Sequence, residues 1–283
     1  MEKFDVAIIG AGSGGLSVAA GASQLGLKTV LFEKAEMGGD CLNTGCVPSK
    51  ALLKAAKVAQ GVRTSETFGI APLQPDVDFS AVKDHVHSVI GAIAPHDSVE
   101  RFEGLGVRVV QEHAQFVDAH TLQAGDQTFK ARKFVIATGS RASIPPIEGL
   151  DADKIYTNET IFDLREKPDH LIIIGGGPIG IEMAQAHRRL GCKVSELDMG
   201  SILVHDDQEL VQILRERLSG EGIALYEHID IQKIEHKEAV AVHFVREGVE
   251  PKKIIGSHIL VAAGRAPNVD GLDLEKAGVE YDR

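Results

Sequence analysis

The sequence has few cysteines, no long apolar segment and no excess of positive charge, and each shortage excludes a class of protein. Three cysteines among 283 residues are too few for the disulfide framework of a secreted domain. No apolar run approaches the roughly 20 residues that a membrane-spanning helix needs. The formal net charge of −11 makes a nucleic-acid-binding surface an unfavourable interpretation. We therefore expect a soluble protein with no nucleic-acid or membrane partner.

What the sequence does contain is the composition of a globular protein. Apolar residues make up 43% and charged residues 25% of the chain, which are ordinary values for a globular protein. A chain of 283 residues is long enough for two domains, each with its own core. The first stretch, MEKFDVAIIGAG, lacks the basic segment, the long apolar segment and the cleavage site of a signal peptide. A cytoplasmic location is the expectation.

Two of the cysteines, Cys41 and Cys46, stand in GGDCLNTGCVPSKALL beside several glycines. Three interpretations are open: two buried small hydrophobic residues, a zinc site or a redox-active disulfide. The four-residue gap, with no second ligand cluster nearby, argues against zinc, so no metal site is expected. The run SKALLKAAKVAQ favours a helix, which places Cys46 near a helix start, where the dipole favours a thiolate. Residues five apart in a regular helix are too splayed for a disulfide, so Gly45 and Pro48 would have to supply an irregular turn, and the bond should be reducible.

A glycine-rich turn near the N-terminus has the pattern of a dinucleotide site. FDVAIIGAGSGG is a buried-strand pattern that runs into Gly10-x-Gly12-x-x-Gly15, followed by an apolar helix and a second strand that ends at Glu33. The glycines let the backbone approach a pyrophosphate at a helix N-terminus, and the acid accepts a hydrogen bond from a ribose hydroxyl.

The same unit occurs a second time. Gly175-x-Gly177-x-x-Gly180 lies between a strand and a helix, and Asp198 ends the next strand. Gly175 and Asp198 follow Gly10 and Glu33 at the same offset of 165 residues. The repeat predicts two dinucleotide sites, and it favours one nicotinamide nucleotide and one FAD, with two-electron traffic that ends on the cysteine pair.

These motifs together resemble the class I pyridine nucleotide-disulfide oxidoreductases, the flavoproteins that include dihydrolipoamide dehydrogenase, glutathione reductase and mercuric reductase. GGDCLNTGCVPSK is similar to their redox-active motif, although Asp40 replaces a usual threonine. VIATGS, residues 135–140, is similar to the end of their first flavin-binding stretch, and VAAGRAPN, residues 261–268, to their return strand. The resemblance covers the whole chain.

The resemblance implies an α/β fold with two Rossmann-like dinucleotide-binding domains and mainly parallel sheets covered by helices on both faces. Residues 1–146 would form an FAD-binding domain with a helical insertion at about 76–104. Residues 147–264 would form an NAD(P)-binding domain, and residues 265–283 would return to the FAD domain.

The resemblance also assigns roles to single residues. Cys46 would lie next to the flavin, and Cys41 would be the interchange thiol that meets the substrate. Lys50 would lie near the flavin and form an ion pair with Glu182. Cys192 is expected to be structural.

The expected cofactor contacts follow from the same motifs. For FAD they are Gly10, Gly12, Gly14, Gly15, Glu33, Gly39, Asp40, Lys50, Ala114, Thr138, Gly139 and Ser140. For the nucleotide they are Gly175, Gly177, Pro178, Ile179, Gly180, Asp198 and Gly264. Because Asp198 would repel a 2′-phosphate, NAD(H) is expected to be preferred over NADP(H).

The substrate stays open at this point. A lipoyl-type disulfide or dithiol, with electron flow in either direction, is the first expectation, and reduction of Hg(II) is the alternative. Leu42 and SKALL are closer to dihydrolipoamide dehydrogenases, Val47 is common in mercuric and glutathione reductases, and Ser49 stands where glutathione reductases usually have a second lysine. A non-catalytic nucleotide-binding fragment or redox sensor is the alternative of another class.

The resemblance further implies that the chain lacks the C-terminal domain of the family. Members of the family are homodimers with a C-terminal dimerisation domain whose histidine–glutamate pair acts as acid and base. None of the twelve histidines here stands in that motif. We expect weak flavin binding and low turnover from these 283 residues alone.

Overall fold

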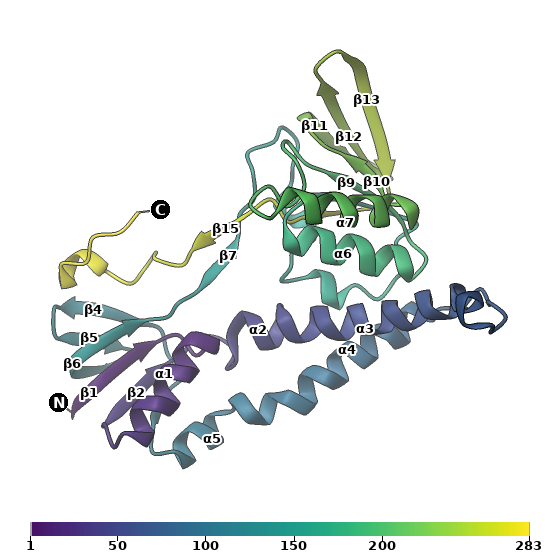
Figure 1. The fold of residues 1–283 in the computed structure, drawn as a ribbon. Coiled ribbons are helices and arrows are strands. Elements are labelled where there is room, and N and C mark those ends of the chain that lie inside the picture. Colours follow the sequence, from purple (N-terminus) through teal and green to yellow (C-terminus); the bar gives the residue numbers. More distant parts are fainter. Residues whose placement is uncertain (1, 283) are drawn as a thin grey trace. The chain divides into compact units, whose positions relative to one another are not determined.

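The computed structural model describes residues 2–282, which form two compact units (Figure 1). The first unit contains residues 2–47, 88–141 and 266–282, and the second contains residues 48–87 and 142–265. Strands of the first unit are β1 (Glu2–Ile9), β2 (Thr29–Phe32), β3 (Arg108–Val110), β4 (Ala114–Asp118), β5 (Thr121–Ala124) and β6 (Gln127–Ile136). Its helices are α1 (Ser13–Gln24), α2 (Gly39–Asn43) and α5 (Val99–Gly104).

The second unit contains the parallel strands β8 (His170–Ile174), β9 (Lys193–Leu197), β10 (Ala224–Tyr226) and β14 (His258–Val261). It also contains β11 (Asp230–His236), β12 (Val240–Arg246), β13 (Val249–Gly256) and the helices α6 (Pro178–Arg189) and α7 (Gln208–Gly220). The helices α3 (Cys46–Arg63) and α4 (Phe79–Ile93) begin or end in the first unit and lie mostly in the second. The paired strands β7 (Ser140–Ala142) and β15 (Arg265–Pro267) carry the chain out of the first unit and back.

The sheet of the first unit has the strand order β3-β2-β1-β6-β5-β4. Strands β3, β2, β1 and β6 are parallel, whereas β5 is antiparallel to both β6 and β4. In the parallel part Ile9 is in register with Phe32 and with Ile136. The carboxyl ends of β1, β2 and β6 therefore meet at one edge, where doubly wound sheets bind their ligands.

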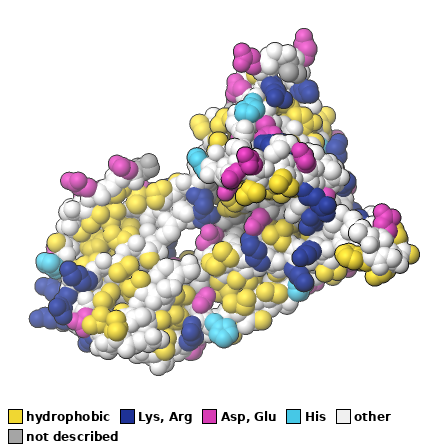
Figure 2. Space-filling model, viewed as in Figure 1, with side chains coloured by type: hydrophobic (Ala, Val, Ile, Leu, Met, Phe, Trp, Pro, Cys, Tyr) yellow, Lys and Arg dark blue, Asp and Glu magenta, His cyan; other side chains and the backbone are white. Residues whose placement is uncertain are grey.

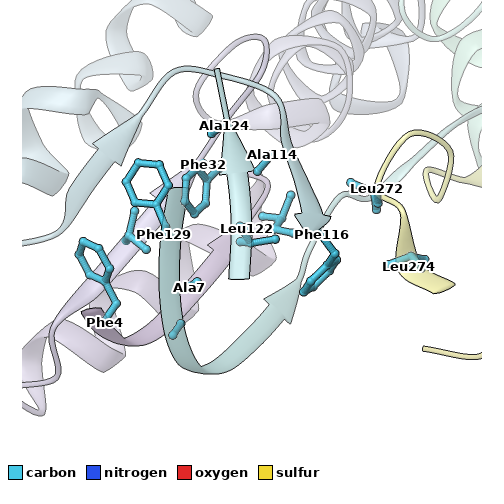
Figure 3. Close-up of a cluster of buried hydrophobic side chains, with 13 residues drawn as sticks. Phe4, Ala7, Phe32, Ala114, Phe116, Leu122, Ala124, Phe129, Leu272 and Leu274 are labelled. Atoms are coloured by element: carbon cyan, nitrogen blue, oxygen red, sulfur yellow. The ribbon is translucent and has the colours of Figure 1, made fainter. Parts of the chain in front are cut away.

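The two faces of this sheet are covered differently. Ile8 and Leu31 pack against Leu16 of α1 and Phe102 of α5. On the opposite face, Phe32 packs with Phe116 of β4, Leu122 of β5 and Phe129 of β6, and with Leu272 and Leu274 near the C-terminus (Figure 3).

The second unit repeats this arrangement. Its parallel sheet has the order β10-β9-β8-β14, and α6 packs on β8 and β9. Apolar side chains on one face of the sheet, including Ile172, Ile174 and Val261, pack against Ile231 and Val242 of the antiparallel β11–β12–β13 sheet. The α/β class with largely parallel sheets is confirmed. The expectation of helices on both faces is wrong, because in each unit antiparallel strands cover one face.

Residues 48–87 group with the second unit, although the sequence placed them in the first domain. Lys83 of α4 is completely buried, and its Nζ donates to the carbonyl oxygen of Ile161 at 2.9 Å. Burial lowers the pKa of Lys83 to about 8. The Arg63 guanidinium donates to the carbonyl of Arg189 at 2.5 Å. These contacts hold α3 and α4 on the second unit, and residues 76–104, predicted as a helical insertion, contain α4 and α5.

Among residues 2–282, no helix has both the length and the apolar character needed to cross a membrane.

Candidate active site

The first glycine turn follows β1 and leads into α1. Gly10 has φ of +103°, and a Cβ on it would lie 2.3 Å from the carbonyl oxygen of Ala137. A Cβ on Gly15 would lie 1.8 Å from the carbonyl oxygen of Gly10. Only glycine fits these positions, because the strand, the turn and the helix approach one another through the backbone.

The second glycine turn has the same geometry between β8 and α6. Gly175 has φ of +114°, and a Cβ on Gly180 would lie 1.9 Å from the carbonyl oxygen of Gly175. Gly12 and Gly177 occupy equivalent positions as the N-caps of α1 and α6. The predicted repeat is therefore a repeat in three dimensions, with the exposed N–H groups of each helix at the turn.

An acidic side chain supports each turn. Glu33 accepts hydrogen bonds from the N–H of Ala11 at 2.7 Å and of Ala35 at 2.8 Å. Asp198 accepts from the N–H of Gly176 and of Gly200, both at 2.6 Å. An ionised carboxylate has about four acceptor positions, so each still has room for ribose hydroxyl groups.

A pocket in the first unit brings together four residues of the predicted FAD set: Gly10, Glu33, Ala114 and Thr138. The sequence missed several other residues that line it, namely Phe32, Lys34, Glu112, His113, Asn268, Asp270 and Leu272. The rest of the predicted FAD set (Gly12, Gly14, Gly15, Gly39, Asp40, Lys50, Gly139 and Ser140) lies outside this pocket. Of these, Gly12 is the N-cap of α1, and Gly14 and Gly15 lie in its first turn.

The carboxyl end of β6 is tied to the returning chain. Thr138 Oγ1 donates to the carbonyl oxygen of Asn268 at 2.6 Å, and Asn268 Nδ2 donates to that of Thr138 at 2.9 Å. The N–H of Asn268 also donates to the carbonyl oxygen of Gly139 at 3.0 Å. Asn268 lies in the VAAGRAPN motif, and that motif was the only sequence signal for its position.

The loop that carries Asp40 lies against the first glycine turn. The N–H of Gly38 donates to the carbonyl oxygen of Ala11 at 2.9 Å, and a Cβ on Gly39 would lie 2.7 Å from the Cα of Gly12. The exposed Asp40 carboxylate accepts from the Thr44 hydroxyl at 2.7 Å. A negative charge therefore lies beside a turn whose geometry suits a pyrophosphate.

The two cysteines lie on either side of a break between two helices. Cys41 belongs to α2, and Cys46 is the first residue of α3. A Cβ on Gly45, between them, would lie 2.8 Å from the carbonyl oxygen of Asp40, so the break requires a glycine. The predicted irregular turn is present, and it brings together two side chains that a regular helix would hold too far apart for a disulfide.

Both cysteines are thiols in this structure, with Cys41 half-buried and Cys46 exposed. Partial burial raises the pKa of the Cys41 thiol, and the hydrogen bond with Cys46 and the charge of Asp97 raise it further. The two cysteine side chains therefore interact with each other, and the disulfide itself stays a prediction.

Lys50 and Glu182 form the expected ion pair within the second unit. Lys50 Nζ lies 2.7 Å from Glu182 Oε1 and 2.9 Å from Oε2. Lys50 follows Cys46 by four residues in α3, so the two lie on the same face of that helix. Glu182 lies in α6, which begins at the second glycine turn.

A cavity of about 550 Å³ opens at the second glycine turn. Six of the seven predicted nucleotide contacts line it: Gly175, Gly177, Pro178, Ile179, Asp198 and Gly264. Gly180 does not, because it packs against the backbone of Gly175. The sequence missed Asn158, Met199, Val204, His205 and Arg265, which also line the cavity. Met199 is 71% exposed.

Cys192 is fully buried, and burial raises its pKa to about 11. It is therefore an unreactive thiol at neutral pH.

Comparison with known proteins places the chain in a family. The family model described as pyridine nucleotide-disulphide oxidoreductase matches residues 4–283, and the chain belongs to this family. Members of the family combine a flavin, FAD, with a pyridine nucleotide.

Two similar proteins differ in the activity that their names give. A dihydrolipoyl dehydrogenase of Geobacillus stearothermophilus is 36% identical over 98% of this chain. A mercuric reductase of Streptomyces lividans is 32% identical over 98% of the chain. The chain spans 60% of the length of each of these relatives.

Among solved structures, the Cu(II) complex of RclA, an HOCl-induced flavoprotein disulfide reductase from Escherichia coli, is similar to the whole of this chain. Its TM-score is 0.85 at 26% sequence identity, and the match covers 61% of that protein.

Proposed function

We propose that the protein is an FAD-dependent oxidoreductase that exchanges two electrons between NAD(H) and a disulfide or dithiol substrate through Cys41 and Cys46. The observation that carries this proposal is the cysteine pair itself, because the helix break at Gly45 brings two thiols five positions apart into contact. Partially exposed, adjacent thiols at a helix start are typical of redox-active rather than structural cysteines.

The residues around the first glycine turn fit FAD. The Gly10–Gly15 turn would hold its pyrophosphate, Glu33 its ribose, and the pocket beside Ala114 and Thr138 its adenosine part. When bound, the flavin supplies a two-electron carrier between the nucleotide and the cysteines. Lys50, paired with Glu182, would place a positive charge near the reacting ring.

The cavity at the second glycine turn fits the nucleotide. The turn would hold its pyrophosphate, and Asp198 would accept from the ribose hydroxyls. A 2′-phosphate beside the Asp198 carboxylate would be repelled. This supports NADH over NADPH.

The cysteines would react with a substrate disulfide by thiol–disulfide exchange. Cys41 gives up its proton, and its thiolate attacks one substrate sulfur to form a mixed disulfide, while the other substrate sulfur leaves and takes up a proton. The Cys46 thiolate then attacks Cys41 Sγ, releases the second substrate thiol and leaves a Cys41–Cys46 disulfide. Two electrons and two protons, from NADH and solvent, restore the dithiol. The reverse sequence oxidises a dithiol such as dihydrolipoamide.

A lipoyl-type compound is the proposed substrate, because the dihydrolipoyl dehydrogenase is 36% identical to the chain. Hg(II) is the second candidate, since a mercuric reductase is also a relative and two adjacent thiolates are suitable ligands for a soft metal ion.

The test compares purified wild-type protein with Cys46→Ser and with Cys192→Ser as a control. Flavin content is measured by absorbance, and NADH oxidation is measured with lipoamide, glutathione disulfide or Hg(II). Loss of turnover in Cys46→Ser, with flavin content and the Cys192→Ser activity retained, is the expected result. Full activity of Cys46→Ser would overturn the assignment, and a yellow protein without NADH-dependent turnover would favour a binding or sensing role.

A further inference from the structure

A second cavity in the second unit is not used by the proposed reaction. Its volume is about 610 Å³, and its charged lining consists of Arg63, Arg188, Arg189, Arg217, Glu216 and Glu221. The arginines come from the last turns of α3, α6 and α7. Figure 2 shows Lys and Arg side chains gathered over this part of the unit. The cavity shares no lining residue with the nucleotide cavity.

Two of the arginines share one carboxylate partner within the protein. The Glu221 side chain is only 5% exposed, and it binds Arg189 and Arg217, both at 2.7 Å. Arg189 donates to both oxygens of Glu221 in a bidentate pair. These two guanidinium groups therefore complete an internal ion-pair network.

Arg63 and Arg188 have no carboxylate partner among residues 2–282. Arg63 donates to the Arg189 carbonyl oxygen and, from Nε, to Gln74 Oε1 at 3.3 Å. Arg188 donates to the carbonyl oxygens of Glu221 at 2.7 Å and of Cys192 at 3.5 Å. These contacts also cap helix ends, where a positive charge is favourable. Helix capping alone does not explain why two arginines lie side by side with a cavity between them.

The two unneutralised arginines act on each other. Partial burial lowers the pKa of Arg63, and the charge of Arg188 lowers it further. A guanidinium has five N–H donors, and the bonds of Arg63 and Arg188 use Nε and Nη1 only. The Nη2 donors of both are left for a ligand, and an anion would remove the repulsion between the two charges.

We propose that this cavity binds a small phosphate-bearing anion between Arg63 and Arg188. The two uncompensated positive charges match a phosphate group, which carries about −1.5 to −2 at pH 7. Guanidinium forks bind such oxygens bidentately. Gln60, Thr64 and Gln74 line the cavity with neutral polar groups, and the volume lies within the ~300–1,000 Å³ of small-molecule sites. Because α6 is 12 residues long, about 18 Å separates this cavity from the glycine turn at its other end.

The test is isothermal titration calorimetry of the whole chain with inorganic phosphate, pyrophosphate and citrate at constant ionic strength. The test variant is Arg63→Gln/Arg188→Gln. The control is Lys57→Gln, which removes an exposed positive charge from the same helix. Each lost charge-assisted bond is expected to weaken binding about tenfold or more, whereas Lys57→Gln should change the affinity less than about twofold.

Saturable binding of phosphate or pyrophosphate by the wild type, lost in the double variant, is the expected result. Equal affinity in the wild type and the double variant would show that the anion binds elsewhere and would overturn the proposal, as would citrate binding without phosphate binding. If the double variant does not fold, the single variants Arg63→Lys and Arg188→Lys keep the charge but lose the planar fork. Unchanged phosphate affinity in both single variants would also overturn the proposal.

Discussion

Replacing Glu196 with leucine should stabilise the protein. Glu196 lies in β9, in the middle of a parallel sheet, with 1% of its surface exposed. Neither of its carboxyl oxygens has a hydrogen-bond partner among residues 2–282. Burial raises the pKa of Glu196 well above its usual value, and the nearby charge of Asp198 raises it further. Burial therefore favours the neutral form of a carboxyl group that has no hydrogen-bond partner among residues 2–282.

The size of the effect follows from two contributions. A buried polar group without a partner costs about 1–3 kcal/mol. In addition, the unfolded chain ionises Glu196 above about pH 4.3, whereas the raised pKa lets the folded chain keep the proton to a higher pH. The free energy of unfolding therefore falls by about 1.4 kcal/mol per pH unit until the raised pKa is reached. Glu196→Leu removes both contributions, and Glu196→Gln removes only the pH-dependent one.

Urea unfolding of both variants at pH 5 and pH 8 measures the two contributions separately, with the exposed Glu238→Gln as the control. At pH 8, Glu196→Leu should gain at least about 1–3 kcal/mol, which corresponds to several degrees in Tm. The gain of Glu196→Gln over the wild type should grow from pH 5 to pH 8. A loss of stability in Glu196→Leu, or a gain of Glu196→Gln that is independent of pH, would refute the argument.

Four further predictions concern the cysteine pair, Lys50 and the two dinucleotide sites. Lys50→Met should slow NADH-dependent disulfide reduction about tenfold or more. It should change the free energy of unfolding by less than about 1 kcal/mol, because the Lys50–Glu182 ion pair is largely exposed. Equal rates in the variant and the wild type would exclude a role of Lys50 in electron transfer. Alkylation of Cys41 by iodoacetamide, followed by peptide mass spectrometry, should keep accelerating above pH 9, because its pKa is raised; a plateau near neutral pH would contradict this. Asp40→Thr should bind FAD several-fold more tightly in a fluorescence titration, since a negative charge beside the glycine turn is removed; weaker binding would show that the carboxylate helps to hold the loop. Asp198→Ala should narrow the ratio of kcat/KM for NADH over NADPH, and an unchanged ratio would assign selectivity to another residue.

The local parts of the site could be predicted from the sequence. The strand, the glycines and the acid of each dinucleotide unit are close together in the chain, and their geometry depends on backbone sterics. The helix break between Cys41 and Cys46 was also predictable, because Gly45 and the five-residue spacing restrict the chain there. The Lys50–Glu182 ion pair, which joins residues 132 positions apart, could be expected only from the resemblance.

Features that depend on long-range packing could not be predicted. No local pattern indicates that Lys83 would be buried against Ile161, so the sequence gives no sign that residues 48–87 group with the second unit. The antiparallel strands over each sheet were missed for the same reason, since an apolar sheet face does not specify what covers it. The cavity between Arg63 and Arg188 depends on residues more than 120 positions apart.

The hydrogen bonds from backbone N–H groups to Glu33 and Asp198 have a consequence for the kinetics of dinucleotide binding. Each carboxylate already bonds the N–H inside its glycine turn, so the turn keeps its shape before a ligand arrives. The conformational entropy of the turn is then lost during folding and not during association. Binding of a dinucleotide should accordingly be a single-step encounter, and its heat-capacity change should reflect only the apolar surface that the ligand covers.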